Sequence, residues 1–268
     1  MMYLIVASRV DEASMNIMNR LMDDFEFEDA KNLYFYGNTV LKVIDDLHIY
    51  HDNIDAEFED ETGEMPEAVI FISMHSSGRA IDTITVHPVG NFGEAMVGGR
   101  NSEVIPASAG LMTSTLRNMQ ETGFRTSFEA THHGPYLESP TFFAEIGSDE
   151  GAWMDSGKGE AVARSLMKTL LGGVENDTVA ISIGGGHYMP TPTELVKKKK
   201  ILFGHMIPNY HLRSYEKGVD MILEKDDVHY AYLDRKAIKK EGLERKKIKK
   251  VLEDRGIEEM DSGAMVSL

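Results

Sequence analysis

A strand that leads into a helix is indicated most clearly by residues 179–199, which read VAISIGGGHYMPTPTELVKKK. Residues 179–183 form a short apolar run typical of a buried strand, and a turn of three glycines follows it. Residues 191–194, TPTE, have the residue types of a helix start: a capping hydroxyl, a proline at the first helical position and an acid that completes a capping box. The sequence therefore predicts a helix over residues 193–199 and an α/β unit joined by the glycine turn. In open α/β sheets, ligands bind beyond the carboxyl ends of such strands.

Apolar runs and amphipathic stretches alternate in the same way over the rest of the chain, which predicts a three-layer α/β/α fold with a mixed sheet. The predicted strands are residues 2–7, 33–36, 69–73, 83–86, 126–130, 142–146, 179–183, 201–205 and 228–233. The predicted helices are residues 13–22, 107–121, 159–170, 193–199, 215–223 and 236–255. We expect residues 1–235 to form one α/β domain, on which residues 236–268 pack as a basic helix and tail. The acidic stretch 55–64 is predicted to be a surface loop or the edge of a lid.

Composition restricts the kind of site that the chain can build. The 268 residues include no cysteine, which excludes disulfides, a thiol nucleophile and every thiolate metal site. A zinc ion could be held only by histidine, aspartate, glutamate and water, and such sites are more often catalytic than structural. The chain has no long apolar run, and Arg9 and Asp11 follow its first apolar residues closely. We therefore expect neither a membrane span nor a signal peptide, and a cytoplasmic location.

The charge of the chain is distributed unevenly. The formal net charge is −16, yet residues 197–250 hold 16 Lys and Arg against 8 Asp and Glu, a net of +8. A localised basic patch on an acidic protein fits a phosphate-binding surface. The alternative is a solvated helix face, balanced by Glu241 and Glu244.

Histidines follow two of the predicted strands. His132 and His133 come directly after residues 126–130, and His187 follows the glycine turn. Histidine is the commonest metal ligand, and strand ends can direct several such side chains to one point. Because successive strand residues alternate faces, one of the adjacent histidines can bind metal while the other orients a neighbour. Both can converge if His133 lies in the turn made by Gly134-Pro135. For His187, the alternative is a capped surface histidine.

Further polar residues lie near these histidines in the sequence. Glu138 and Glu145 could serve as metal ligand and general base. The alternative for Glu145 is a half-buried strand residue that pairs with a cation. His75, His87 and His205 each end a predicted strand, and each alone is typical of a buried, hydrogen-bonded histidine.

The glycine turn has a possible function of its own. Its glycines let the backbone approach a ligand, and the N–H groups of Gly184, Gly185 and Gly186 can receive an anion or an oxyanion. The turn lacks the three spaced glycines of dinucleotide-binding loops, and no Lys-Ser/Thr pair of a phosphate loop follows it. Neither nucleotide-binding motif is therefore present.

Four separated motifs carry histidine in order along the chain: FISMHS (71–76), TVHPVGNF (85–92), EATHHGP (129–135) and GGHY (185–188). With these motifs, and over roughly residues 1–235, the chain resembles the D-aminoacyl-tRNA deacylases of archaeal and plant type. The resemblance implies hydrolysis of the ester that joins a D-amino acid to tRNA, and it implies zinc dependence. It also implies a phosphorylase/hydrolase-like α/β fold, which peptidyl-tRNA hydrolases and zinc exopeptidases share.

The residues and the resemblance together give a candidate site. We expect His132, His133 and His187 to bind zinc, with Glu145 or Glu138 completing the site. His75 is expected to have a catalytic role. Zinc-activated water would attack the ester carbonyl while the glycine turn stabilises the oxyanion. The residues expected to hold tRNA phosphates are Lys197, Lys198, Lys199 and Lys200.

The expected partner is aminoacyl-tRNA, with neither DNA nor a membrane, and the expected state is a monomer. Two other functions stay open. A peptidyl-tRNA hydrolase-like or other zinc amidohydrolase activity could use the same fold, because fold does not fix function. Alternatively, the chain could bind tRNA without catalysis, its histidines being structural.

Overall fold

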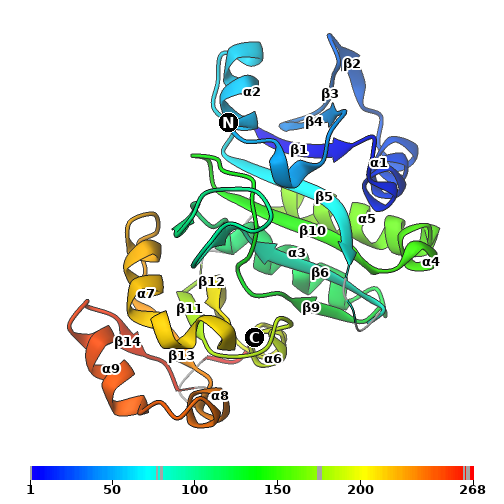
Figure 1. Cartoon of the computed structure of the whole chain (residues 1–268). Coiled ribbons are helices and arrows are strands. Elements are labelled where there is room, and N and C mark those ends of the chain that lie inside the picture. Colours follow the sequence, from blue (N-terminus) through cyan, green and yellow to red (C-terminus); the bar gives the residue numbers. More distant parts are fainter. Residues whose placement is uncertain (1, 77, 79–80, 174–176, 262, 264–265) are drawn as a thin grey trace.

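The structure, a computed structural model, describes residues 2–268 except 77, 79–80, 174–176, 262 and 264–265. An eight-stranded mixed sheet forms the body of the described chain, in the strand order β2-β3-β4-β1-β5-β10-β6-β9 (Figure 1). The central strands β4, β1, β5 and β10 run parallel, and β6 is antiparallel to β10. The strands are β1 (Tyr3–Ser8), β2 (Glu28–Ala30), β3 (Leu33–Tyr36), β4 (Thr39–Ile44), β5 (Ala68–Ser76), β6 (Thr83–Pro88), β9 (Thr126–Phe128) and β10 (Thr141–Ser148).

Helices cover both faces of this sheet, which explains why its central strands are apolar on both sides. In β1, Ile5 packs in one core with Ile17 of α1, whereas Leu4 packs in another core with Phe58 of α2. Figure 1 shows α2 on one side of the sheet and α1, α4 and α5 on the other. These layer helices are α1 (Glu12–Asp24), α2 (Ile54–Thr62), α3 (Ala109–Gln120), α4 (Glu150–Trp153) and α5 (Ser156–Gly172).

A second, parallel sheet of four strands continues the fold in the order β12-β11-β13-β14. One face has its own core with α7, α8 and α9, in which Ile181 lies with Ile222 and Ile238. On the other face, Phe203 and Met206 join the main core, where β12 packs against α3. The remaining elements are β7 (Gly90–Asn91), β8 (Glu103–Val104), β11 (Val179–Ile183), β12 (Leu202–Ile207), β13 (Tyr230–Leu233), β14 (Glu258–Glu259), α6 (Pro190–Val196), α7 (Tyr215–Leu223), α8 (Arg235–Lys240), α9 (Arg245–Glu253), and the 3-10 helices η1 (His48–Tyr50) and η2 (Asn209–Ser214).

The predicted α/β fold, a mixed sheet flanked by helices, is confirmed. The bounds of β3, β11 and α7 coincide with the predicted ranges. The helix after the glycine turn starts earlier than predicted: α6 has Pro190 in its first turn, and Met189 occupies the cap position assigned to Thr191.

Two other predicted segments differ in the structure. The acidic stretch 55–64 is mostly helix α2 and not a loop, because Ile54 and Phe58, one turn apart, are both fully buried. The predicted helix 236–255 is two helices, because Gly242 takes a left-handed conformation (φ +71°) after α8. Residues 236–268, which were predicted as a basic helix and tail on the same domain, also contribute the short strand β14, which pairs with β13.

Within the described ranges, no helix combines the length and the apolar character needed to cross a membrane.

Candidate active site and metal centre

Polar side chains gather on one face of the main sheet. Glu145 of β10 pairs in register with Ser73 of β5, so both project from this face. His75, two residues after Ser73, projects from it as well, since strand side chains alternate. His87 of β6 lies opposite Phe143, which precedes Glu145 by two residues on β10. Strand pairing therefore brings two histidines and a carboxylate together from three strands.

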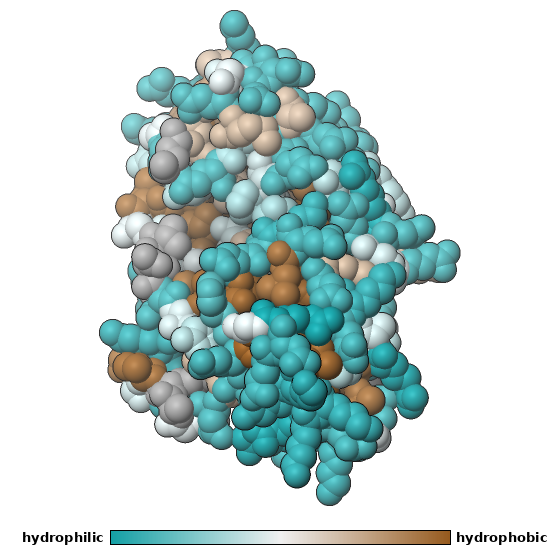
Figure 2. Space-filling view, turned by 90° about the vertical axis from the view of Figure 1, so that its left-hand side faces the viewer, coloured by the Kyte–Doolittle hydropathy of each residue, from teal (hydrophilic) through white to brown (hydrophobic). Residues whose placement is uncertain are grey.

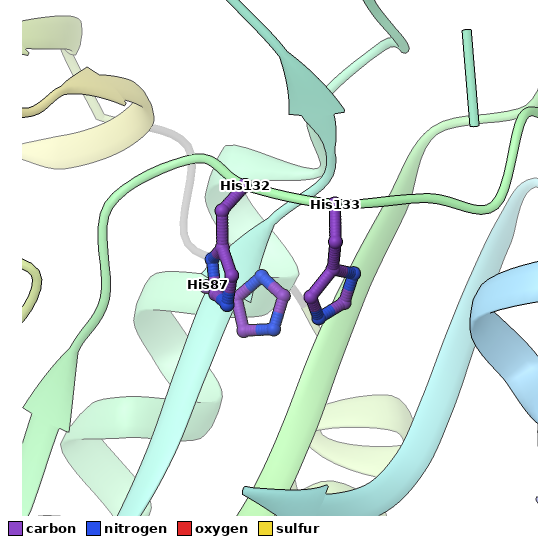
Figure 3. Close-up of side chains that lie close together, drawn as sticks. All are labelled: His87, His132 and His133. Atoms are coloured by element: carbon purple, nitrogen blue, oxygen red, sulfur yellow. The ribbon is translucent and has the colours of Figure 1, made fainter. Parts of the chain in front are cut away.

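The segment after β9 crosses this face and contributes Glu129, His132 and His133. Its backbone is tied to the glycine turn, because the Ala130 N–H donates to the carbonyl of His187 (2.8 Å). His133 has a φ of +45°, which turns the chain at that residue. Figure 3 shows the rings of His132 and His133 both pointing from this segment toward the strands. Of the two arrangements predicted for the adjacent histidines, the converging one is present.

His87, His132 and His133 form a first cluster, the histidine triad, whose candidate ligand atoms lie within 4.8 Å of one another (Figure 3). In each ring, Nδ1 lies near a backbone carbonyl oxygen, at 3.1 Å for His87, 2.8 Å for His132 and 2.6 Å for His133. Because a carbonyl oxygen can only accept, Nδ1 carries a proton in each ring. Nε2 is therefore the nitrogen that each ring can offer to a metal ion.

His75, Glu129 and His187 form a second cluster, the mixed triad. The Glu129 carboxylate is central to it, with Oε2 2.8 Å from Nε2 of His187 and Oε1 3.3 Å from Nδ1 of His75. Glu145 links the two triads, since its oxygens lie 3.4 Å from Nδ1 of His75 and 3.6 Å from Nε2 of His87. The two triads are thus parts of one site.

Burial and neighbouring charges give these histidines different pKa values. Burial lowers the pKa of His133 to about 4. Burial, with His87 and His133 close by, lowers the pKa of His132 well below its usual value. Burial lowers the pKa values of His75 and His87, but the carboxylates of Glu145 and Glu129 together outweigh it, so both pKa values are raised. In turn, His87 and His75 hold the pKa of Glu145 well below its usual range although burial would raise it.

Several buried polar atoms of the site make no hydrogen bond within the described part of the chain. They are both carboxylate oxygens of Glu129, Oε2 of Glu145 and Nε2 of His87. Glu129 is fully buried, and a buried carboxylate without hydrogen bonds is costly unless a cation compensates it. Sets of three imidazole nitrogens and carboxylate oxygens are also typical ligands of catalytic zinc. The residues of both triads therefore fit a bound metal ion.

Comparison with known proteins identifies the family. Residues 62–260 match the family model described as D-aminoacyl-tRNA deacylase. The chain is 36% identical to the D-aminoacyl-tRNA deacylase of Pyrococcus abyssi, in an alignment that covers 96% of this chain and 98% of that protein. The chain belongs to the D-aminoacyl-tRNA deacylase family.

Other relatives agree with this membership. The D-aminoacyl-tRNA deacylase of Pyrococcus horikoshii is 37% identical over 78% of this chain and 81% of its own length. The D-aminoacyl-tRNA deacylase of Methanosarcina mazei is 36% identical, in an alignment that covers 94% of this chain and 90% of that protein. A crystal structure described as a conserved protein of unknown function, AF0625, has a TM-score of 0.87 and 28% identity, covering 100% of this chain and 99% of its own. The predicted family is thereby confirmed, and with it the prediction that the chain is an enzyme.

A metal ion that binds to the two triads is expected to release protons. The pKa values of His75 and His87 are raised, which favours their protonated rings, whereas the lowered pKa values of His132 and His133 favour neutral rings. Because a metal ion binds the deprotonated ring, we expect it to displace protons from His75 and His87. The apparent affinity of the chain for the metal ion should rise with pH, since fewer protons then need to be displaced from the histidines. Titration calorimetry in buffers of different ionisation enthalpy measures the number of protons released, and zero release would contradict the assignment.

Most of the predicted site residues meet at one place. His132, His133, His187, His75 and Glu145 all belong to the two triads or link them. The two residues that sequence reasoning missed or discounted are Glu129 and His87. Glu129 is an acid inside the predicted strand 126–130, three residues before His132, and that spacing within the motif EATHHGP is the signal that could have identified it.

Glu138 lies apart from the site. Its side chain is exposed and accepts a hydrogen bond from the Tyr136 hydroxyl. Its backbone N–H donates to Asp55 of α2 (2.9 Å), because the chain after Pro135 leaves the triads and runs toward that helix. The predicted role of Glu138 at the metal does not fit this position.

The glycine turn offers fewer free donors than predicted. The N–H of Gly184 donates to a carbonyl of β12 (2.8 Å), and that of Gly185 donates to Oδ1 of Asn209 (2.8 Å). Gly186, whose N–H makes no hydrogen bond among the described residues, lines a large hollow beside the mixed triad. An oxyanion-binding role therefore does not fit Gly184 or Gly185 and is available to Gly186.

The basic run lies at the surface directly after α6. Lys197, Lys198 and Lys200 are exposed, and Lys198 pairs with Glu194 (3.0 Å). The Lys199 ammonium donates to the Ser267 hydroxyl (3.2 Å). These lysines lie outside both triads, so their predicted role is limited to contacts at a distance from the reacting ester.

Three hollows meet at the site. A central pocket of about 290 Å³ lies over Glu145. It shares His132 and His133 with a side pocket of about 230 Å³, and it shares Ser76 and His187 with a large hollow of about 930 Å³. A substrate placed over Glu145 can therefore extend in two directions.

Proposed function

We propose that this chain hydrolyses the ester bond of D-aminoacyl-tRNA in the central pocket, with zinc bound to the two triads. Family membership supports the reaction. The metal is supported by the buried carboxylates of Glu129 and Glu145, which have oxygens without hydrogen bonds next to the histidines. The observation that carries the proposal is that both triads border the central pocket, so one bound ester can reach both.

The two triads would hold the metal. When bound, zinc would polarise the ester carbonyl and lower the pKa of a water molecule. His87, His132 and His133 would provide Nε2, while their Nδ1–H groups, bonded to backbone carbonyls, keep the rings oriented. The mixed triad would provide the Glu129 carboxylate together with His75 and His187.

Glu145 has the geometry of a positioning residue. Its Oε1 accepts a hydrogen bond from the Ser73 hydroxyl (2.7 Å), and the carboxylate lies between His75 and His87. Because those histidines hold its pKa well below the usual range, Glu145 is a weak base at neutral pH. The negative charge of Glu145 instead holds the rings of His75 and His87 in place and balances their positive charge.

Gly186 is the backbone donor best placed for the developing oxyanion. Its N–H faces no internal acceptor among the described residues, and it directly precedes His187 of the mixed triad. Backbone N–H groups held in a fixed turn stabilise negative charge on a carbonyl oxygen as the tetrahedral state forms.

The basic segment 197–250 would bind tRNA phosphates. It carries a net charge of +8, and exposed lysines lie on α8 and α9. Some of this charge is neutralised internally, as in the pairs of Lys247 with Glu244 and Lys250 with Asp254. In Figure 2, hydrophilic side chains cover the lower part of the molecule, at the height where Figure 1 places α8 and α9. Binding through phosphates would weaken with added salt.

The proposed reaction is tested by the release of D- and L-tyrosine from preformed tyrosyl-tRNA, with and without a chelator. We expect the D-ester to be lost about a hundredfold faster than the L-ester, since a fixed site discriminates by geometry. Chelation should abolish the reaction and added zinc should restore it. Loss of the D-ester that is insensitive to chelation would reject the role of zinc and keep the deacylase. Loss of neither ester would reject the proposed function.

A further inference from the structure

The side pocket next to His132 and His133 has an aromatic and apolar lining. Phe92 forms its buried wall, and the rings of Phe92, His211 and Tyr210 follow one another with centroids 5.9 Å and 4.9 Å apart. Met96 and Val97, which are 78% and 40% exposed, also line it, together with the polar residues Asn91, Glu94 and Thr131. Exposed apolar side chains grouped at the mouth of a pocket mark a binding surface for an apolar group.

The large hollow on the other side of the site has a different lining. Arg125, Thr126 and Ser127 border it along the start of β9, and Thr193 and Glu194 border it from α6. The exposed lysines of the basic run follow α6 directly. Its volume of about 930 Å³ far exceeds the 230 Å³ of the side pocket. Polar groups, space and nearby cations suit a nucleotide and its phosphates.

An ester in the central pocket has one substituent on each side of its reacting carbon. One substituent is the amino acid with its side chain, and the other is the terminal ribose of the tRNA. The central pocket shares His132 and His133 with the side pocket and shares His187 with the large hollow, so the two substituents have one neighbouring space each.

We propose that the side pocket receives the side chain of the D-amino acid, and that Phe92, Met96 and Tyr210 determine which side chains are preferred. This inference rests on the proposed function. At roughly 30 Å³ per water molecule of liquid, the pocket has the volume of about eight water molecules, which suits an aromatic side chain. The site therefore favours large, apolar D-amino acids over small ones.

Gly93 offers a way to fill this pocket. A Cβ atom at this position would lie 3.3 Å from Cε1 of His211, and Gly93 does not have the left-handed backbone that disfavours other residues. Gly186 is a matched position in the large hollow, where a Cβ would have ordinary contacts, the nearest at 3.6 Å. The substitutions G93V and G186V thus add the same side chain on opposite sides of the site.

The experiment measures kcat/KM for D-tyrosyl-tRNA and D-alanyl-tRNA with the wild-type chain, G93V and G186V. We expect G93V to lower the D-tyrosine to D-alanine ratio at least about tenfold, because the larger side chain loses its space. G186V should lower both values and leave the ratio within about twofold. A changed ratio in G186V but not in G93V would reverse the assignment, and equal losses in both variants would overturn it.

A second variant covers the case in which G93V does not fold. Met96 is 78% exposed, so M96A leaves the fold intact while it removes an apolar contact at the mouth of the side pocket. It should lower the D-tyrosine to D-alanine ratio about threefold or more, and an unchanged ratio would count against the pocket. If the wild-type chain deacylates neither substrate, the proposed function fails. If it deacylates both and no variant changes the ratio, only the pocket assignment fails.

Discussion

Glu129→Gln is expected to lower kcat/KM for D-tyrosyl-tRNA by roughly a thousandfold and to remove zinc from the mixed triad. Glutamine has the size of glutamate, but it has no charge and places an amide donor group near His75 and His187. The Glu129 oxygens lie 3.3 Å and 2.8 Å from those rings and make no hydrogen bond among the described residues. A ligand is thus removed while the packing is kept.

In the metal-free protein, the same substitution removes the negative charge that lies beside His75 and His187. We expect it to destabilise that form, because Glu129 is fully buried and its charge compensates the buried ring of His75, whose pKa is raised. Metal analysis, steady-state kinetics and thermal unfolding without metal measure the three effects. Glu138→Gln is the matched control, since Glu138 is exposed and apart from the triads, and its activity should stay within about twofold of wild type. Normal zinc content and activity in Glu129→Gln would contradict the assigned ligand role.

Glu145→Gln is expected to lower kcat by roughly a hundredfold, because Glu145 holds His75 and His87 at the junction of the two triads. It should also change the protonation of the site. Without this carboxylate, Glu129 is the remaining carboxylate that opposes the effect of burial, so the pKa values of both histidines should fall. The number of protons that a metal ion displaces should therefore be lower than in the wild-type chain.

Ser73→Ala separates the charge of Glu145 from its hydrogen bond. The variant removes the hydroxyl that donates to Oε1 and leaves the carboxylate in place. We expect a loss of about tenfold or less in kcat, with proton release as in the wild-type chain.

Unchanged proton release in Glu145→Gln would show that Glu145 does not set the protonation of His75 and His87. Calorimetry and single-turnover kinetics on the same preparations provide both measurements.

Local patterns predicted most of the elements but failed where burial depended on distant partners. The apolar run of β11 and the amphipathic helix α7 have the predicted bounds, because each is specified by its own periodicity. The acidic stretch 55–64 was wrong as a loop, since its two apolar positions become a buried helix face only when packed against β1 and its neighbours. Gly242 interrupts the predicted C-terminal helix because its backbone takes a left-handed conformation. The presence of a glycine at this position indicated the break only weakly.

The candidate site shows the same division. The motifs around His132, His133 and His187 identified these histidines as candidate metal ligands. In a chain without cysteine, only histidine, aspartate, glutamate and water can hold a zinc ion. Glu138 and Glu145 could not be told apart in the sequence. Only the pairing of β10 with β5 and β6 places Glu145 between two histidines, while the chain carries Glu138 toward α2.

By itself, the sequence determined the α/β class, the family and the chemical types available to the site, since periodicity, motifs and the absence of cysteine are local properties. The tertiary structure decided which of these residues meet. Glu129 and His87 join the site because strand register and the turn at His133 bring β6, β10 and the segment after β9 onto one face. Register is fixed by pairing between segments that are distant in the chain, so no local pattern records it.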